Sequence, residues 1–128
     1  MNEIKFRGKK TSTKEWIYGS LISDNNGGFA IVQIMDNPIK NGEVTGWCFG
    51  VIPETVGQFT GRTDKNKKDI FKGDKNQDGG VVVWNQDDAS FCWEYENVDT
   101  HLMGDENEWC EIVGNIHEQK IKTNEQQQ

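Results

Sequence analysis

The sequence predicts a mainly β protein, built as a small barrel or a rolled antiparallel sheet with short irregular or helical insertions. No long segment repeats apolar residues at the i, i+3, i+4, i+7 spacing of an amphipathic helix. The chain instead contains about eight short apolar or alternating runs, separated by turns rich in Gly, Asn and Asp. Five tryptophans and six phenylalanines supply large side chains for a core. A chain of 128 residues is long enough to bury such a core without disulfides.

The first clear pair of strands is Trp16–Ile22 and Phe29–Met35. The residues between them, SDNNGG, include Asn and Gly, which accept positive φ at low cost, so we expect a hairpin. A shorter strand at Ile4–Phe6 precedes this pair. The apolar run Thr45–Ile52 follows it and ends at Pro53, which fixes its own φ and holds the preceding residue extended.

Residues 51–74 read VIPETVGQFTGRTDKNKKDIFKGD. After the proline, Val56 and Phe59 are predicted to enter the core, on a strand with a bulge or close backbone approach at Gly57 and an end at Gly61.

The polar turn TDKNKKD comes next along the chain. Asp64 is expected to accept hydrogen bonds from nearby backbone amides, and Asn66 is a residue that tolerates a left-handed conformation. Ile70 and Phe71 then return to the core, before a corner at Gly73-Asp74.

The second half contains three predicted strands. Val81–Trp84 is apolar at every position, which predicts a strand covered on both faces. Ser90–Glu96 alternates, and the short polar connection NQDDA predicts that these two strands pair antiparallel. Ile112–His117 is the last strand. Residues 97–111 are acidic and irregular, so we expect a long loop with one helical turn near Asp105–Cys110.

We expect one β-rich domain over residues 1–118, or two joined subdomains at about 1–50 and 51–118. The tail, residues 119–128, has little to bury and should fray.

The net charge of −7 is unevenly distributed. Residues 1–74 hold 11 Lys or Arg against 9 Asp or Glu, whereas residues 75–128 hold 3 against 12. This polarity favours self-association or an electropositive partner, and the acidic total argues against nucleic acid.

The composition also predicts a cytoplasmic protein. No run approaches the ~18 apolar residues of a membrane helix, and the N-terminus lacks a hydrophobic signal region. The chain has an odd number of cysteines at irregular spacing, so we expect reduced thiols at Cys48, Cys92 and Cys110.

Five stretches, in this order, resemble the YopX protein family of bacteriophages and prophages. They are IKFRGK (4–9), EWIYGSL (15–21), the block 51–74, VVVW (81–84) and EIVGNIHE (111–118). The central block is the longest and most specific of them. The resemblance implies a small β-rich protein that is SH3-like at least in part, with no catalytic or cofactor residues to carry over.

The chain departs from the family pattern at two places. The family usually has Asn-Gly in the polar turn, where this chain has Asn66-Lys67. The family usually has an apolar pair after the Gly-Asp corner, where this chain has Lys75-Asn76, so we expect the strand near 74–80 to be short or displaced.

The stretch Asp74–Gly79 fits D-x-N-x-D-G, the first half of a calcium-binding loop. The twelfth position, which should be Glu, is Asn85, and a strand follows instead of a helix. Lys75 adds a competing positive charge. We therefore interpret this stretch as a solvated turn and predict no metal there.

No catalytic or cofactor site is predicted. The three cysteines, His101 and His117 form no C-x-x-C or H-x-x-x-H pair of the kind found in structural zinc sites. Cys92 and His117 could meet across strands as nucleophile and base, but their spacing does not require it. GRTDKNKK lacks the G-K-[ST] ending of a phosphate-binding loop.

Two groups of residues are candidates for binding. The basic edge has Phe59 and Phe71 in its sequence neighbourhood, as a surface for single strands would require. Its residues are Arg62, Lys65, Lys67, Lys68 and Lys72. The acidic loop consists of Asp105, Glu106, Glu108 and Trp109. Its tryptophan is either an exposed anchor for a protein partner or a cap on one end of the barrel.

We therefore expect a non-enzymatic, phage- or prophage-type binding or assembly protein that forms a homo-oligomer, with a host or phage protein as a further partner. One alternative is an acidic decoy that mimics nucleic acid and occupies a host protein. The other is a weak binder of single-stranded nucleic acid that uses the basic edge. An enzyme ranks last.

Overall fold

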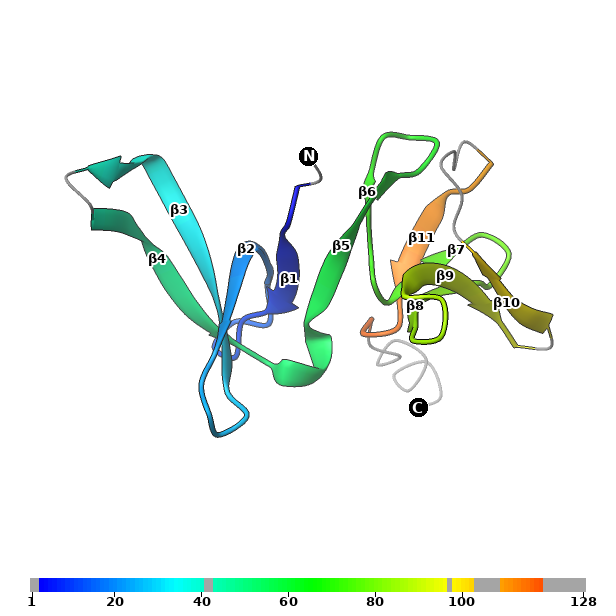
Figure 1. Cartoon of the computed structure of the whole chain (residues 1–128), viewed down its shortest axis with the longest axis horizontal. Coiled ribbons are helices and arrows are strands. Elements are labelled where there is room, and N and C mark those ends of the chain that lie inside the picture. Colours follow the sequence, from blue (N-terminus) through cyan, green and yellow to red (C-terminus); the bar gives the residue numbers. More distant parts are fainter. Residues whose placement is uncertain (1–2, 41–42, 97, 103–108, 119–128) are drawn as a thin grey trace, which may run out of the picture. The chain divides into compact units, whose positions relative to one another are not determined.

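The computed structural model describes residues 3–40, 43–96, 98–102 and 109–118 (Figure 1). Its strands form two antiparallel sheets, and the described residues contain no α-helix. The prediction of a mainly β protein is therefore confirmed. Within the described residues the strand orders have open ends, so no closed barrel is found.

The chain divides into two compact units, residues 1–61 and 62–128, and each is described by itself. Among the described residues, no helix has the length and apolar character needed to cross a bilayer. The expectation of one domain, or of two subdomains divided near residue 50, stays a prediction.

The strands of the first unit follow the order β4-β3-β2-β1-β5 in their antiparallel sheet, and β5 continues past the unit boundary to Thr63. The predicted hairpin is confirmed, with Ser23 of β2 opposite Phe29 of β3. The strand β3 continues farther than predicted and forms a long hairpin with β4 (Figure 1). The elements are β1 (Phe6–Lys9), β2 (Trp16–Ser23), β3 (Phe29–Lys40), β4 (Glu43–Val51), the 3₁₀ turn η1 (Pro53–Thr55) and β5 (Gly57–Thr63).

The core of the first unit lies on one face of this sheet. Ile17, Ile31 and Val51 are buried there. Phe6, Leu21, Phe29, Phe49 and Val56 are half-buried against them. Gly19 is needed where β2 crosses β3, because a Cβ at this position would lie 2.2 Å from the carbonyl oxygen of Val32.

The strand β5 differs from its prediction in two respects. Gly61 does not end it; the strand continues to Thr63, with Gly61 inside at φ +88°. Val56 packs on the core as predicted, but Phe59 does not. The register pairs Phe6 with Gln58, so Phe59 lies on the opposite face of the sheet.

The second unit contains a sheet with the strand order β10-β9-β8-β7-β11, preceded along the chain by β6. Antiparallel pairing of β8 with β9 is confirmed, and β7 is short, as expected. The strand β10 occupies part of the predicted loop, while most of the predicted helical turn lies outside the described residues. The elements are β6 (Asp69–Phe71), β7 (Asp74–Asn76), β8 (Val81–Asn85), β9 (Ser90–Tyr95), β10 (Val98–Leu102) and β11 (Ile112–Asn115).

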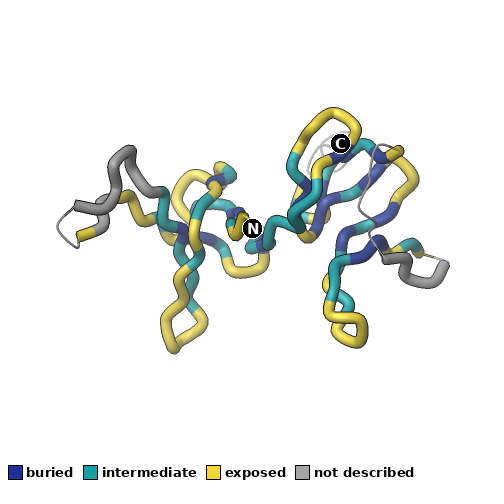
Figure 2. Tube along the Cα trace, turned by 45° about the horizontal axis from the view of Figure 1, so that its top comes forward, coloured by how far each residue is buried: buried dark blue, intermediate teal, exposed yellow. Residues whose placement is uncertain are grey.

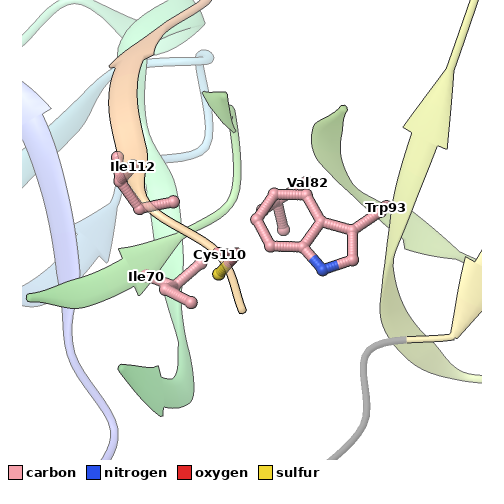
Figure 3. Packing of buried hydrophobic residues seen from close by; sticks show 5 residues of the cluster. All are labelled: Ile70, Val82, Trp93, Cys110 and Ile112. Atoms are coloured by element: carbon pink, nitrogen blue, oxygen red, sulfur yellow. The ribbon is translucent and has the colours of Figure 1, made fainter. Parts of the chain in front are cut away.

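The core of the second unit includes Trp93, whose indole ring points toward the other core side chains in Figure 3. Its other members are Ile70, Val82, Cys110 and Ile112. The prediction that Val81–Trp84 is covered on both faces is wrong, because only Val82 is buried and Trp84 is 43% exposed. Adjacent buried residues, which mark a strand covered on both faces, occur instead in β9 at Cys92 and Trp93 and in β6 at Ile70 and Phe71. Burial here follows from neighbouring strands, which a local apolar run does not specify.

Three hairpin turns share one design, and exposed residues gather at such turns in Figure 2. Their sequences are DNNGG (24–28), DKNKK (64–68) and NQDGG (76–80). In each turn the first side chain accepts hydrogen bonds from the backbone N–H groups two and four residues later. The fourth residue has positive φ: Gly27, Lys67 and Gly79. The role predicted for Asp64 is thus confirmed, but the left-handed residue is Lys67, not Asn66.

Candidate functional site

Cationic side chains line one face of the first unit's sheet. Because β1 directs Phe6 toward the core, the alternating residues Lys5, Arg7 and Lys9 lie on the opposite face. On the neighbouring strand β2, Tyr18 stands opposite Arg7 and Trp16 stands opposite Lys9. Strand pairing thus brings cations and aromatic rings together on the face that does not form the core.

Three cation–ring contacts organise this face. The Nζ atom of Lys5 lies 4.7 Å from the ring centroid of Phe59. The guanidinium carbon of Arg7 lies 4.7 Å, and Nζ of Lys9 5.4 Å, from the ring of Trp16. A ring orients a cation without cancelling its charge. We name Lys5, Arg7, Lys9, Trp16, Tyr18 and Phe59 the cationic face.

The members of the cationic face differ in their access to solvent. Arg7 is buried, at 5% exposure, whereas Tyr18 is 46% exposed. Lys5 and Lys9 are half-buried, and Lys5 also pairs with Glu3 at 3.5 Å. A fourth contact, between Lys10 and Phe49 at 4.1 Å, belongs to the other side, since Phe49 packs on the core. Trp16 and Phe59 are half-buried as well, so Arg7 is the one member of the cationic face that is withdrawn from solvent.

A shallow hollow of about 380 Å³ adjoins the cationic face and shares Lys5 and Tyr18 with it. The strand pairing between β2 and β3 starts at Ser20, which lies opposite Val32. Just beyond its end, the side-chain amide of Gln33 donates to the carbonyl oxygen of Tyr18 at 3.3 Å. The hollow is lined by Glu3, Ile4, Lys5, Tyr18, Gly19, Ser20, Val32 and Gln33.

The predicted basic edge lies in the second unit. Arg62 is half-buried, whereas Lys65, Lys67, Lys68 and Lys72 are exposed. Lys65, Lys67 and Lys68 belong to one turn, and Lys65 forms an ion pair with Glu111 at 3.4 Å.

The two aromatic residues predicted to accompany the basic edge lie elsewhere. Phe71 is buried, at 3% exposure. Phe59 belongs to the first unit, where it contacts Lys5. The structure therefore shows no exposed phenylalanine beside these lysines among the described residues.

Asp64 organises the turn of the basic edge from a buried position, at 4% exposure. Its Oδ1 accepts from the amides of Asn66 (2.8 Å) and Lys68 (3.0 Å), and Oδ2 accepts from Ile112 (2.9 Å). Burial alone would raise the pKa of this carboxyl. The amide hydrogen bonds, with help from the Lys68 charge, outweigh that effect and hold the pKa below its ordinary value. Asp64 is therefore an ionised carboxylate whose hydrogen bonds link this turn to β11.

Trp109 also belongs to the second unit. Its side chain is 48% exposed and contacts Trp93 edge-on, with 6.0 Å between ring centroids. The side-chain amide of Gln77 donates to the Trp109 carbonyl and accepts from the Glu111 amide, both at 2.9 Å. Asp105, Glu106 and Glu108 of the predicted acidic loop lie outside the described residues.

The calcium-like stretch is solvated only in part: Gln77, Asp78 and Gly79 are exposed, as predicted, but two of its first three residues are not. Asp74 and Asn76 are 1% and 2% exposed. A carboxylate oxygen of Asp74 accepts from the amide of Phe71 at 2.8 Å. Asn76 accepts from two amides of its turn and donates to the hydroxyl of Tyr95. Both side chains thus contribute oxygen atoms to local turn structure.

The thiols lie at separate places. Cys48 is exposed in the first unit, whereas Cys92 and Cys110 are buried in the second. Burial raises the pKa of both buried thiols, and the charge of Asp64 adds to the effect at Cys110. Among the described residues, no three His, Cys, Asp or Glu side chains gather as metal ligands would.

Cys92 and His117 do not form the pair weighed from the sequence. Cys92 is on β9, and His117 follows β11; the strands β8 and β7 lie between them in the sheet. The other histidine considered, His101, is on β10, where the structure describes the backbone only.

The sequence predictions missed the cationic face. Its signal was present in IKFRGKK, where cations occupy alternate positions of a strand. The rings that these cations contact come from β2 and β5, and that pairing is not visible in the local sequence.

Comparison with known proteins gives one positive finding. The model of a family described as "YopX protein" matches residues 5–120, nearly the whole chain. No match to the chain was found among curated proteins.

Proposed function

The chain belongs to the YopX protein family, and we propose that it is a non-enzymatic binding protein whose contact surface is the cationic face of the first unit. The observation that carries this proposal is the set of three ring-supported cations beside an exposed tyrosine and an open hollow. This combination suits a polyanionic partner, because charge attracts the partner and the rings hold the cations in place.

The acidic total charge does not oppose this proposal. The first unit has 6 Lys or Arg and 6 Asp or Glu, whereas the second has 8 and 15. Within residues 3–14 the count is 5 against 1. Salt screens charges beyond roughly 8–10 Å, so the local set governs contact at the face.

Binding of inorganic polyphosphate to the full-length protein at low salt tests the proposal by calorimetry. We expect binding that weakens as salt rises and that is lost when Lys5→Gln and Lys9→Gln are combined. The matched double variant Lys65→Gln with Lys68→Gln removes two charges from the basic edge and should bind like the wild type. Absence of binding at low salt, or equal loss in both double variants, would contradict the proposal.

Self-association is a second candidate, favoured by the outer strand β4. In the recorded sheet order β4 ends the first unit's sheet, and its Trp47 is 62% exposed. An open strand edge with a large apolar side chain is a site at which a second copy can add its own strand. Light scattering after gel filtration should show an oligomer that Trp47→Glu dissociates, and a wild-type monomer at high micromolar concentration would rule this out.

Family resemblance further supports a phage or prophage origin and an SH3-like arrangement of part of the sheet, which we propose on that basis. The free thiols of Cys48, Cys92 and Cys110 support a reducing compartment such as the cytoplasm. A host or phage protein bound through the acidic loop, including the decoy role, stays a prediction because most of that loop lies outside the described residues.

A further inference from the structure

We infer that the cationic face binds single-stranded nucleic acid, with a base stacked on Tyr18 and phosphates held by Lys5 and Lys9. This inference rests on the proposed function and names the partner of the same face. It differs from the hypothesis drawn from the sequence, which placed such binding at the basic edge of the second unit.

The spacing of the cations fits an extended polyanion. Arg7 and Lys9 lie two residues apart on β1, and Lys5 lies two residues before Arg7, just outside the strand, so successive Cα atoms are about 6.6 Å apart in extended chain. This distance is close to that between successive phosphates of an extended single strand. Lys5 and Lys9 reach solvent, while the buried Arg7 adds charge between them and contacts Trp16.

Tyr18 supplies a stacking surface beside these cations. It stands opposite Arg7 on β2, and nearly half of its side chain is exposed. Every base has a π-face, so an accessible ring next to a basic track can hold unpaired bases of any sequence. A duplex keeps its bases stacked on one another and cannot offer this contact, which favours a single strand.

The hollow extends this surface away from β1. Ser20 and Gln33 line it next to Tyr18, so hydrogen-bonding groups lie near the place that a stacked base would occupy. An acidic peptide would also be attracted by the lysines, but it has no planar base to place on Tyr18 or over the hollow.

Fluorescence anisotropy of the full-length protein with a labelled oligothymidylate of about twelve nucleotides tests the inference directly. The competitors are a duplex of the same length, inorganic polyphosphate and polyglutamate. We expect the unlabelled single strand to compete best at equal charge. Equal competition by polyphosphate or polyglutamate would overturn the inference while leaving the proposed polyanion site standing. If no polyanion binds at low salt, both fail.

Variants separate stacking from charge. Tyr18→Ala should weaken oligothymidylate binding by roughly 5- to 150-fold and leave polyphosphate binding unchanged, while Tyr18→Phe keeps the wild-type affinity. Lys5→Gln and Lys9→Gln should each reduce the steepness of the log–log salt dependence by about 0.7. Lys68→Gln, the matched control on the basic edge, should leave that steepness unchanged.

Two outcomes of the variant series would overturn the inference. One is a folded Tyr18→Ala protein, checked by circular dichroism, that binds oligothymidylate as tightly as the wild type. The other is a salt dependence that responds to Lys68→Gln and not to Lys5→Gln, which would move the site to the basic edge. Lys5→Gln changes a half-buried side chain just before β1, where we expect the fold to tolerate it. The salt dependence of this variant therefore tests the inference even if Tyr18→Ala impairs folding.

Discussion

The two units use the same turns and the same strand alternation, yet they use their polar side chains in different ways. In the second unit Asp64, Asp74, Asn76 and Asn115 are buried, and each accepts a hydrogen bond from the backbone. In the first unit Arg7 and Thr55 are also buried, but Lys5 and Lys9 lie on the outer sheet face against aromatic rings.

This difference indicates a division of labour between the units. A buried polar group destabilises a fold unless its hydrogen bonds are made, so the second unit's polar residues have structural roles in its interior. Cations held against rings keep their charge, so Lys5 and Lys9 of the first unit remain suited to a partner. Substitutions at four positions would break or sharpen this comparison, and the positions follow from the largest expected effect to the smallest.

Trp93→Ala should destabilise the second unit most. The side chain is 2% exposed and belongs to the core drawn in Figure 3, so its loss should cost about 3–5 kcal/mol of unfolding free energy. Urea unfolding measures this. Trp84→Ala, at a 43% exposed position of β8, is the matched control and should cost far less.

Trp93→Phe refines this prediction. The indole N–H of Trp93 is buried and has no hydrogen-bond partner among the described residues. Phenylalanine removes no hydrogen bond and should therefore retain most of the stability that alanine loses. Equal costs for phenylalanine and alanine would show that the ring is not what fills this core.

Gly19→Ala should lower the stability of the first unit, as Trp93→Ala does that of the second. A Cβ there would meet the carbonyl oxygen of Val32 at 2.2 Å, so β2 and β3 must separate, at a cost of about 1–3 kcal/mol or more. Thermal unfolding measures the loss. Gly50→Ala is the control, since its nearest neighbour would be Thr11 Oγ1 at 3.5 Å, an ordinary contact. A neutral Gly19→Ala would contradict the strand crossing described here.

Asp64→Asn should destabilise the second unit by about 1–3 kcal/mol, because its amide keeps the turn but presents N–H to the amide of Ile112. Since the folded pKa of Asp64 is depressed, its contribution is present above the ordinary value of 3.8 and is lost as pH falls through the folded value. Urea unfolding across this acid range should show a smaller decline for the variant. An identical decline in both proteins would assign the acid sensitivity to other carboxyls.

Lys67→Gly should stabilise the protein by about 0.5–1 kcal/mol, the smallest effect in the series. Lys67 has φ +65°, a conformation that glycine adopts without strain, and the equivalent residues of the other two turns are Gly27 and Gly79. A rise in melting temperature checks it. Gly79→Ala, the reverse change in the related turn, should lower the melting temperature; a rise there would disprove the shared turn design.

Much of the local structure could be predicted from the sequence. The hairpin of β2 and β3 follows from alternation and from the turn DNNGG, and Asp64 follows from the known preference of Asp for turns. The strand β10 was missed, although Val98, Thr100 and Leu102 alternate with polar residues, because its acidic surroundings were interpreted as loop.

The candidate site could not be predicted in the same way, because its contacts come from strands distant in sequence. Lys5 meets Phe59, more than fifty residues away, and the hollow combines residues of β2 and β3 with residues 3–5. The net charge of −7 also pointed away from the first unit's cations, since a total does not show where charges of one sign gather. The strand pairing had to be known first.

Backbone amide chemical shifts of the full-length protein during an oligothymidylate titration test the central claim most directly. The account predicts that shifts concentrate at β1, at Trp16–Ser20 of β2 and near Phe59, with residues 64–76 of the second unit unaffected. Shifts centred on the turn 64–68, or none at low salt, would contradict it.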